Sequence, residues 1–326
     1  MTQSLASLDQ LFDRTDERLR SGHDVVAASW PTGFVPLDGQ LGGGLRVGKL
    51  TLLSGPQGLG KTTWAVQAAR NVVRAGGRVV YFSFEHEHDS FLERLLAQAA
   101  FEVAGLDAPT TRKIRERLER AAKNGRAGLG ELLADLPGGA EALASLREGA
   151  GRFLVHQSSG RSMSVRAMSA VLDGLEDGPA PLVVVDYLQK VPRDEGDERE
   201  VVESLKDLAL ERQVPVLALV AASTAGIAPG HRMRLHEMRG SSSLAYEPDV
   251  VLILNDKYDV VARHHLVYGG ANAERFRDYV VLSIEKNRSG RDHVDLEFRK
   301  LFSHACFDPN GQLVAEQLVD ERVHLE

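Results

Sequence analysis

A glycine-rich segment constrains the fold of this chain more than any other feature of its sequence. It reads Gly55-Pro56-Gln57-Gly58-Leu59-Gly60-Lys61-Thr62, which matches the phosphate-binding pattern G-x-x-x-x-G-K-[ST]. A strand-like run at 49–54 precedes it, and residues from Thr63 onward have helical composition. This order places a bound anion at the positive end of a helix. The flanks make a chance match in a glycine-rich chain a poor explanation.

The residue types in this loop predict how a nucleoside triphosphate is held. Glycines let backbone N–H groups turn inward around phosphate oxygens. The ammonium group of Lys61 reaches the β- and γ-phosphates, and the hydroxyl of Thr62 ligates Mg²⁺. Residues 55–63 are therefore the expected nucleotide-binding segment.

Composition limits the class of protein. The 326 residues suffice for one large α/β domain or two ordinary ones. The net charge of −7 argues against indiscriminate binding of nucleic acid, although a local basic channel remains compatible with it. The single cysteine, Cys306, excludes an intramolecular disulfide and argues against a cysteine-based zinc site. With no secretory leader and no apolar run long enough to span a bilayer, we expect a cytoplasmic protein without membrane association.

Strand-like and helix-like segments alternate along the middle of the chain. We predict strands at 49–54, 78–84, 152–156, 181–186, 215–221 and 249–254, and helices at 63–75, 89–103, 163–175 and 199–211. This alternation predicts a mostly parallel central sheet flanked by helices. Segments 278–285, 293–298 and 302–306 predict an antiparallel extension at the C-terminal end.

Three further stretches set the expected domain organisation. Residues 5–21 have helical spacing with Gly22 as a stop, and such an isolated helix needs a packing partner in its own domain or a neighbouring subunit. Residues 30–48 read as turns. Residues 106–150 read as an insertion of short helices and loops. We predict an N-terminal helical appendage at 1–30 and one domain at 31–326.

Two carboxylates are candidates for chemistry beside the loop. Asp186 ends the apolar run 182–185, where a metal-linked aspartate is expected, although a strand-ending Asp in a turn is the simpler alternative. Glu85 ends another strand and is the leading candidate to activate water. The alternative for Glu85 is a surface carboxylate. His86 and His88 fit a solvated loop better than a metal cluster.

Several motifs in a fixed order give the chain a specific resemblance. They are residues 32–38 (Thr-Gly-Phe-Val-Pro-Leu-Asp), the glycine loop, Phe82-Ser83-Phe84-Glu85 with Arg94, Asp186-Tyr187-Leu188-Gln189, and Lys286-Asn287-Arg288-Ser289-Gly290. Together they resemble the C-terminal RecA-like ATPase domain of DnaB-type replicative helicases, over roughly Leu5 to Phe307.

The resemblance implies a P-loop ATPase that uses ATP and Mg²⁺. It implies that Glu85 activates water, that Asp186 and Thr62 hold the metal, and that Lys61 acts in catalysis. Lys286 and Arg288 resemble the pair that reaches the γ-phosphate bound by a neighbouring subunit. That pattern implies a homo-oligomeric ring, usually a hexamer, and the helix at 5–21 resembles the linker helix that docks on the adjacent subunit.

The segment 222–243 resembles loops that face the central pore of such rings. Its cations Arg232, Arg234 and Arg239 suit sequence-independent contact with phosphates of single-stranded DNA. A solvated surface loop is an equally good reading from sequence alone. Residues 238–244 also resemble the Arg-Gly-Ser segment of RecA-like proteins.

Two features depart from the family pattern. Where the family has a glutamine that senses the γ-phosphate, this chain has Ala221. The loss of one such donor commonly costs about 3 kcal/mol in the transition state, roughly a hundredfold in rate. About thirty residues precede the expected ATPase core, so we also expect a stand-alone domain without the primase-binding region, rather than the main replicative helicase.

These observations leave three functions open. The first is a ring ATPase that acts on single-stranded DNA as an accessory helicase or translocase, with the 5′–3′ helicases as its model. The second is a regulatory or assembly ATPase of the same fold with weak hydrolysis and no unwinding. The third, a strand-exchange ATPase, is disfavoured by the segments at 186–189 and 286–288.

Overall fold

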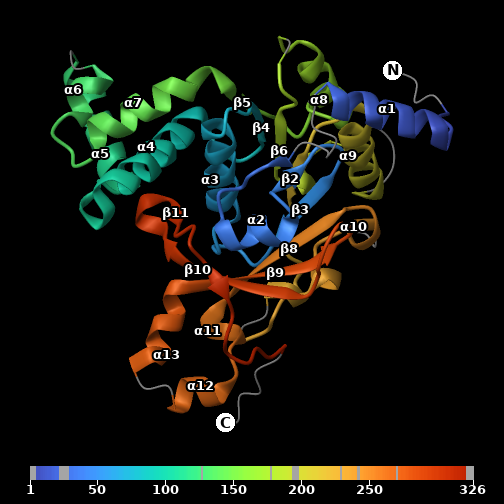
Figure 1. Cartoon of the computed structure of the whole chain (residues 1–326). Helices are drawn as coiled ribbons and strands as arrows, with labels where there is room; N and C mark the ends of the chain where they lie inside the picture. The colour runs from blue at the N-terminus through green and yellow to red at the C-terminus, as the bar shows by residue number, and fades with distance from the viewer. Residues whose placement is uncertain are drawn as a thin grey trace.

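The chain is organised around one large sheet (Figure 1). The computed structural model describes residues 5–21, 29–125, 128–176, 178–192, 198–227, 230–240, 243–268 and 271–320. Within them, ten strands form the sheet in the order β11-β10-β9-β8-β3-β7-β6-β4-β5, and β12 also pairs with β10. Two short strands, β1 (Ser29–Trp30) and β2 (Leu45–Arg46), form a separate antiparallel pair.

Six neighbouring strands are parallel, which confirms the sheet predicted from the alternating segments. They are β3 (Leu50–Ser54), β4 (Val79–Ser83), β5 (Phe153–Gln157), β6 (Leu182–Asp186), β7 (Val216–Leu219) and β8 (Val250–Asp256). Helices cover both faces of most of them, so these strands are continuous apolar runs rather than alternating ones. The parallel arrangement brings the carboxyl ends of the strands to one edge of the sheet.

The C-terminal strands run antiparallel, as predicted. They are β9 (Tyr279–Asn287), β10 (Val294–Leu301), β11 (Cys306–Phe307) and β12 (Gln312–Leu313). The expected strand at 302–306 is mostly wrong. Phe302–His304 form a 3-10 turn and Ala305 has a left-handed φ of 52°, because the chain reverses direction there before β11 begins.

Two helical layers enclose the sheet. On one face α3 (Lys61–Arg74) packs through Trp64, which stacks on Phe34 with ring centroids 5.0 Å apart. On the other face lie α8 (Val165–Asp173) and α9 (Glu198–Arg212), with Val202 and Leu205 fully buried. These helices connect successive parallel strands and therefore fix the positions of the loops at the carboxyl edge of the sheet.

A helix occupies part of the stretch 30–48, which we expected to be rich in turns. Helix α2 (Val35–Leu41) has Pro36 in its first turn, where no N–H partner is needed, and ends at Gly42 with a φ of 68°. The Asp38 carboxylate accepts hydrogen bonds from the backbone N–H groups of Thr32 and Gly33. The motif at 32–38 is thus explained by a turn that Asp38 holds in place.

The region 106–150 is more helical than the expected mixture of short helices and loops. Helices α5 (Thr111–Asn124), α6 (Leu129–Leu133) and α7 (Gly139–Gly149) pack with α4 (His88–Ala104) into a block at one end of the molecule (Figure 1). The block has its own apolar core, formed by Leu96, Ile114, Leu133, Leu136 and Leu143. Exposed Arg and Glu residues on α5 obscured this helix in the sequence.

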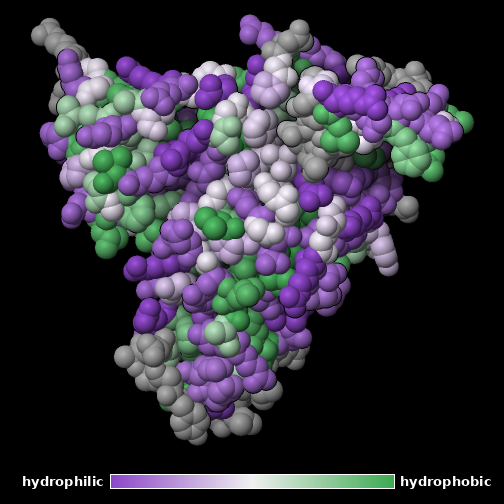
Figure 2. Space-filling model, in the orientation of Figure 1, coloured by the Kyte–Doolittle hydropathy of each residue, from purple (hydrophilic) through white to green (hydrophobic). Residues whose placement is uncertain are grey.

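The predicted N-terminal helix is present as α1 (Leu8–Arg20). It begins with a capping box between Ser7 and Gln10, and none of its residues is buried. Leu8, Phe12 and Leu19 are each at least 60% exposed. Figure 2 shows apolar surface beside hydrophilic surface along this helix. The proposed stop at Gly22 lies outside the described residues.

Four short helices complete the described part: α10 (Ser243–Tyr246), α11 (Lys257–Val260), α12 (Arg263–Tyr268) and α13 (Ala271–Arg275). The last three lie between β8 and β9, at the lower end of the molecule in Figure 1. Within the described residues, no helix combines the length and apolar character needed to cross a bilayer.

Candidate nucleotide site

The glycine loop connects β3 to α3, and two of its positions require glycine. A Cβ atom on Gly55 would lie 2.6 Å from the carbonyl oxygen of Leu254, and one on Gly60 would lie 2.8 Å from the ring of Phe302. Gly60 also has a φ of 86°, which a larger residue adopts only with strain. Any side chain at these positions would displace the loop from the N-terminus of α3, where backbone N–H groups are free to bind phosphate.

Lys61 lies in the first turn of α3 and points back into the loop. Its Nζ donates hydrogen bonds to the carbonyl oxygens of Gly55, at 2.7 Å, and Pro56, at 3.0 Å. Burial lowers the pKa of Lys61 to about 8, although the nearby carboxylates of Asp186 and Glu85 oppose this shift. A phosphate that enters the loop would offer the ammonium group a charged partner in place of two neutral ones.

Asp186 and Thr62 come together at the carboxyl end of β6. The Asp186 side chain is 2% exposed and accepts hydrogen bonds from the hydroxyl of Tyr81, at 2.7 Å, and from the hydroxyl of Thr62. Burial raises the pKa of the Asp186 carboxyl. One carboxylate and one hydroxyl suit Mg²⁺, which usually keeps water and phosphate oxygens as its other ligands.

Glu85 follows β4, the strand beside β6, and its side chain is exposed to solvent. The hydroxyl of Tyr187 donates a hydrogen bond to it, and burial together with the charge of Glu85 raises the pKa of Tyr187. Glu85 is close enough to Lys61 to influence its pKa. The structure thus gathers Lys61, Thr62, Glu85 and Asp186 at one edge of the sheet.

Two tyrosines in this site were absent from the sequence-based candidates. Tyr81 lies in the middle of β4 and reads as an ordinary core residue, while Tyr187 was noted only as part of a motif. The alternation of side chains along a strand places Tyr81 on the same face of β4 as Ser83. It does not show that Asp186, on another strand, lies beside Tyr81. Among the described residues, no three His, Cys, Asp or Glu side chains are grouped as a metal centre, and His86 and His88 form none.

Lys286 and Arg288 lie at the opposite edge of the sheet. The N–H of Arg288 donates to the carbonyl of Asp249, whose own N–H donates to Leu50, the first residue of β3. The glycine loop follows the last residue of β3, so about 16 Å of strand separates the two places. Lys286 donates to the carbonyl oxygens of Ala245 and Tyr246, each at 2.8 Å, and the Arg288 guanidinium also bonds to Tyr246.

The three arginines predicted to contact DNA have different environments. Arg232 is 5% exposed, and its guanidinium bonds to Asp295 and Ser283. A buried guanidinium with a carboxylate partner cannot reach a DNA phosphate, so Arg232 is removed from the candidate contacts. Arg234 is partly exposed and pairs with Glu285 and Asp320.

Arg239 is exposed, and among the described residues it forms no ion pair. It therefore remains the best candidate of the three for contact with phosphate. Pro229, Ser241 and Ser242, which belong to the same predicted segment, lie outside the described residues.

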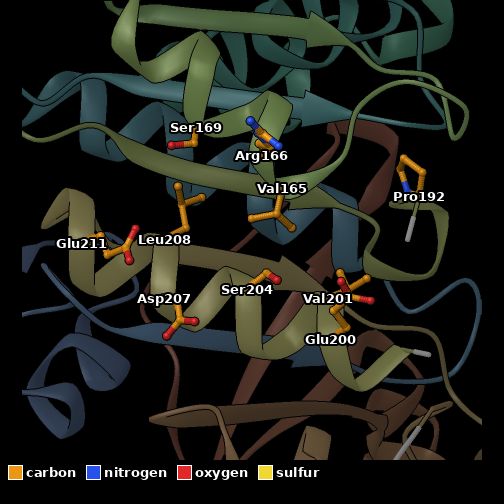
Figure 3. Close-up of a pocket in the computed structure, with 10 residues that line it drawn as sticks. All are labelled: Val165, Arg166, Ser169, Pro192, Glu200, Val201, Ser204, Asp207, Leu208 and Glu211. Atoms are coloured by element: carbon orange, nitrogen blue, oxygen red, sulfur yellow. The ribbon is translucent and has the colours of Figure 1, made fainter. Parts of the chain in front are cut away.

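A groove between α8 and α9 lies on the sheet face opposite α3 (Figure 3). Its rim carries Glu200, Asp207 and Glu211, against one cation, Arg166. These carboxylates repel phosphate, so the groove is not part of the nucleotide site.

The strand order and the residues around the glycine loop define a RecA-like P-loop ATPase fold. A family model described as the DnaB-like helicase C terminal domain matches residues 29–305. The chain belongs to this family.

Curated relatives match a part of the chain. Protein RecA of Clavibacter michiganensis is 40% identical over 88 residues, which are 26% of this chain and 24% of that protein. The chain thus spans about a quarter of the length of the curated relatives it matches.

Two solved structures share the fold over most of the chain. One is an ATPase domain with a TM-score of 0.70 and 20% identity, covering 93% of this chain and 99% of its own. The other is described as a DnaB-like replicative helicase and its interactions with primase. It has a TM-score of 0.69 and 20% identity, and the match covers 92% of this chain and 68% of that one.

Proposed function

We propose that this protein is an ATP-hydrolysing ring motor that acts on single-stranded DNA as an accessory helicase or translocase. The observation that carries the proposal is the separation of Lys286 and Arg288 from the glycine loop by the length of β3. Cations placed there cannot reach a phosphate in their own loop. A neighbouring subunit, most simply in a hexameric ring, would bring them to its site.

The chain's own residues supply the rest of the reaction. Residues 55–63 hold the triphosphate of ATP, and Lys61 binds its outer phosphates. Thr62 and Asp186 hold Mg²⁺, which neutralises charge on the phosphates when bound. Glu85 orients the attacking water and accepts its proton, and Lys286 and Arg288 of the next subunit stabilise the charge on the transferring phosphoryl group.

The apolar face of α1 supports assembly into a ring. Leu8, Phe12 and Leu19 remain exposed, and a helix with such a face gains stability when another surface covers it. We propose that α1 docks on the adjacent subunit. Arg239, and in part Arg234, would face the pore and bind the DNA backbone, with 5′–3′ polarity as in the helicases that the sequence resembles.

The test is ATP turnover with and without single-stranded oligo(dT) at low salt, with native mass measurement in Mg²⁺ and a non-hydrolysable ATP analogue. We expect DNA to raise turnover, and the complex to be a closed ring. DNA binding should weaken steeply as salt rises because phosphate contacts release counterions. The proposal is contradicted if DNA does not change the rate of ATP turnover, or if the protein stays monomeric.

A second candidate is a regulatory or assembly ATPase, which Ala221 favours. An alanine side chain has no donor for the γ-phosphate, so hydrolysis would be slow while nucleotide binding persists. This candidate predicts nucleotide-dependent oligomerisation with turnover indifferent to DNA, an outcome that the same experiment separates from the first.

A further inference from the structure

A single side chain joins the catalytic edge of the sheet to the segment proposed to face DNA. Gln189 lies in the 3-10 turn Leu188–Lys190 that follows β6. Its Oε1 accepts a hydrogen bond from the backbone N–H of Ala221 at 3.1 Å, and its Nε2 donates to the carbonyl oxygen of Arg239 at 2.7 Å. These partners, one a donor and the other an acceptor, fix the orientation of the amide.

The two backbone partners of Gln189 belong to the base of one hairpin. The N–H of Arg239 donates to the carbonyl of Ala221 at 2.9 Å, and Ala222 pairs with Met238 in an antiparallel bridge. The N–H of Ser223 donates to the carbonyl of Glu237 at 2.8 Å. Residues 221–223 and 237–239, which we call the hairpin base, therefore form a ribbon that continues from the end of β7 and carries the loop between them.

The other end of the connection is the nucleotide site itself. Gln189 stands three residues after Asp186, which bonds to Thr62, and two residues after Tyr187, which bonds to Glu85. Leu188 between them is 1% exposed and packed in the core, so the turn has little freedom to absorb a displacement. A backbone shift at Asp186 and Tyr187 would therefore reach the Gln189 amide and its two hydrogen bonds.

We propose that Gln189 is the positioning residue that transmits nucleotide occupancy from Glu85 and Asp186 to the hairpin base. The proposal deepens, and rests on, the ATPase function proposed above. It assigns to a side chain in the turn after β6 the link that Ala221, which has no functional side chain, cannot make. The amide contacts the backbone of residue 221, so this link does not depend on the side chain at that position.

The test measures hydrogen exchange of the hairpin base with and without Mg²⁺ and a non-hydrolysable ATP analogue, in the absence of DNA. In the unaltered protein we expect nucleotide to change exchange at residues 221–223 and 237–239 by at least about fivefold. The variant Gln189→Met keeps the length of the side chain and removes both hydrogen bonds. It should bind nucleotide with unchanged affinity and lose the nucleotide-dependent change.

The chain offers a closely matched control. Gln67 on α3 also uses both ends of its amide, here with one residue. Its Oε1 accepts a hydrogen bond from the N–H of Phe307 at 2.8 Å, and its Nε2 donates to the carbonyl oxygen of Phe307 at 2.9 Å. Gln67→Met should therefore keep the response of the hairpin base to nucleotide. A purely structural role for Gln189 would instead speed exchange equally with and without nucleotide.

A second variant keeps the test decisive if Gln189→Met is unstable. Gln189→Glu retains the acceptor for Ala221 and removes the donor to Arg239, so the response of the hairpin base should weaken but persist. A full response in either variant, or no response in the unaltered protein, overturns the proposal. Failure of DNA to bind or to raise turnover would contradict the DNA function alone, because the exchange measurement contains no DNA.

Discussion

The two edges of the central sheet carry different parts of the proposed reaction centre. At the carboxyl edge, Lys61, Thr62, Glu85 and Asp186 lie close enough to shift one another's pKa values or to share hydrogen bonds. At the opposite edge, Arg288 is 47% exposed on its side chain and bonds mainly to a backbone carbonyl. The first edge groups its side chains around the glycine loop, whereas the second leaves the side chain of Arg288 about half exposed.

In the proposed mechanism neither edge is sufficient alone. The carboxyl edge holds the glycine loop and an ammonium group for phosphate, but Arg288 is not part of it. The opposite edge has the guanidinium but no loop to hold a nucleotide. Variants that remove the key side chain of one edge, and rings that combine two such variants, therefore test whether both edges are needed.

The largest expected effect follows removal of the Arg288 guanidinium at the opposite edge. Arg288→Ala should lower kcat by about 10³-fold or more, as loss of an arginine finger does, with nucleotide affinity nearly unchanged. Steady-state turnover and a binding titration check the two parts. Arg291→Ala, in the same exposed turn, is the control and should retain activity.

Mixing experiments sharpen this prediction. Subunits with Arg288→Ala and subunits with Asp186→Ala are each inactive, but some interfaces of a mixed ring unite an intact loop with an intact arginine. We expect partial recovery of turnover on mixing. No recovery from mixed rings of normal size would break the assignment of Arg288 to a neighbouring site.

The next largest effect follows removal of the Lys61 ammonium group at the carboxyl edge. Lys61→Ala should abolish measurable nucleotide binding, with a loss of affinity of roughly 100-fold or more, because charged hydrogen bonds to phosphate disappear. Titration with a fluorescent ATP analogue measures this loss. Because Lys61 does not contact the opposite edge, the folded state should persist by circular dichroism, and tight binding by this variant would refute its role.

A smaller effect is expected at the γ-phosphate position. Ala221→Gln adds the hydrogen-bond donor that this chain lacks. It should raise kcat by roughly tenfold, which is less than the full effect of one preorganised donor on kcat. Successive side chains of an extended segment point to opposite sides, so Ala222→Gln is the matched control and should give no rise. Equal turnover of Ala221→Gln and the unaltered protein would mean that residue 221 does not face the phosphate.

The last prediction is a pH dependence of binding. The pKa of Lys61 in the free protein is about 8, and a bound phosphate raises it again. Below pH 8 the ammonium group is charged in both states, so affinity should be flat. Above pH 8 binding takes up a proton, and affinity should fall by up to about tenfold per pH unit. Calorimetry from pH 7 to 9.5 measures the slope, which should disappear in Lys61→Arg because arginine stays charged.

The parallel sheet and the glycine loop were predictable because they depend on local patterns. Buried parallel strands are continuous apolar runs, and the loop requires glycine at fixed spacing before a helix. Helix α2 was not predicted within the turn-rich stretch, and α5 is longer than the short helices expected at 106–150, since turn-forming residues and exposed charges mask their helical character. The 3-10 turn at Phe302–His304 was read as a strand, but the ring of Phe302 lies against Gly60 of the glycine loop rather than within the sheet.

The sequence by itself determined which residues can hold phosphate and a metal, because a glycine loop and a strand-ending carboxylate carry that chemistry in their local geometry. Only the tertiary structure decided which side chains meet. It paired Tyr81 with Asp186, removed Arg232 from the DNA contacts by burying it against Asp295, and joined Gln189 to Ala221 and Arg239. These contacts join residues distant in sequence, and strand order and register set their distances, which no local pattern encodes.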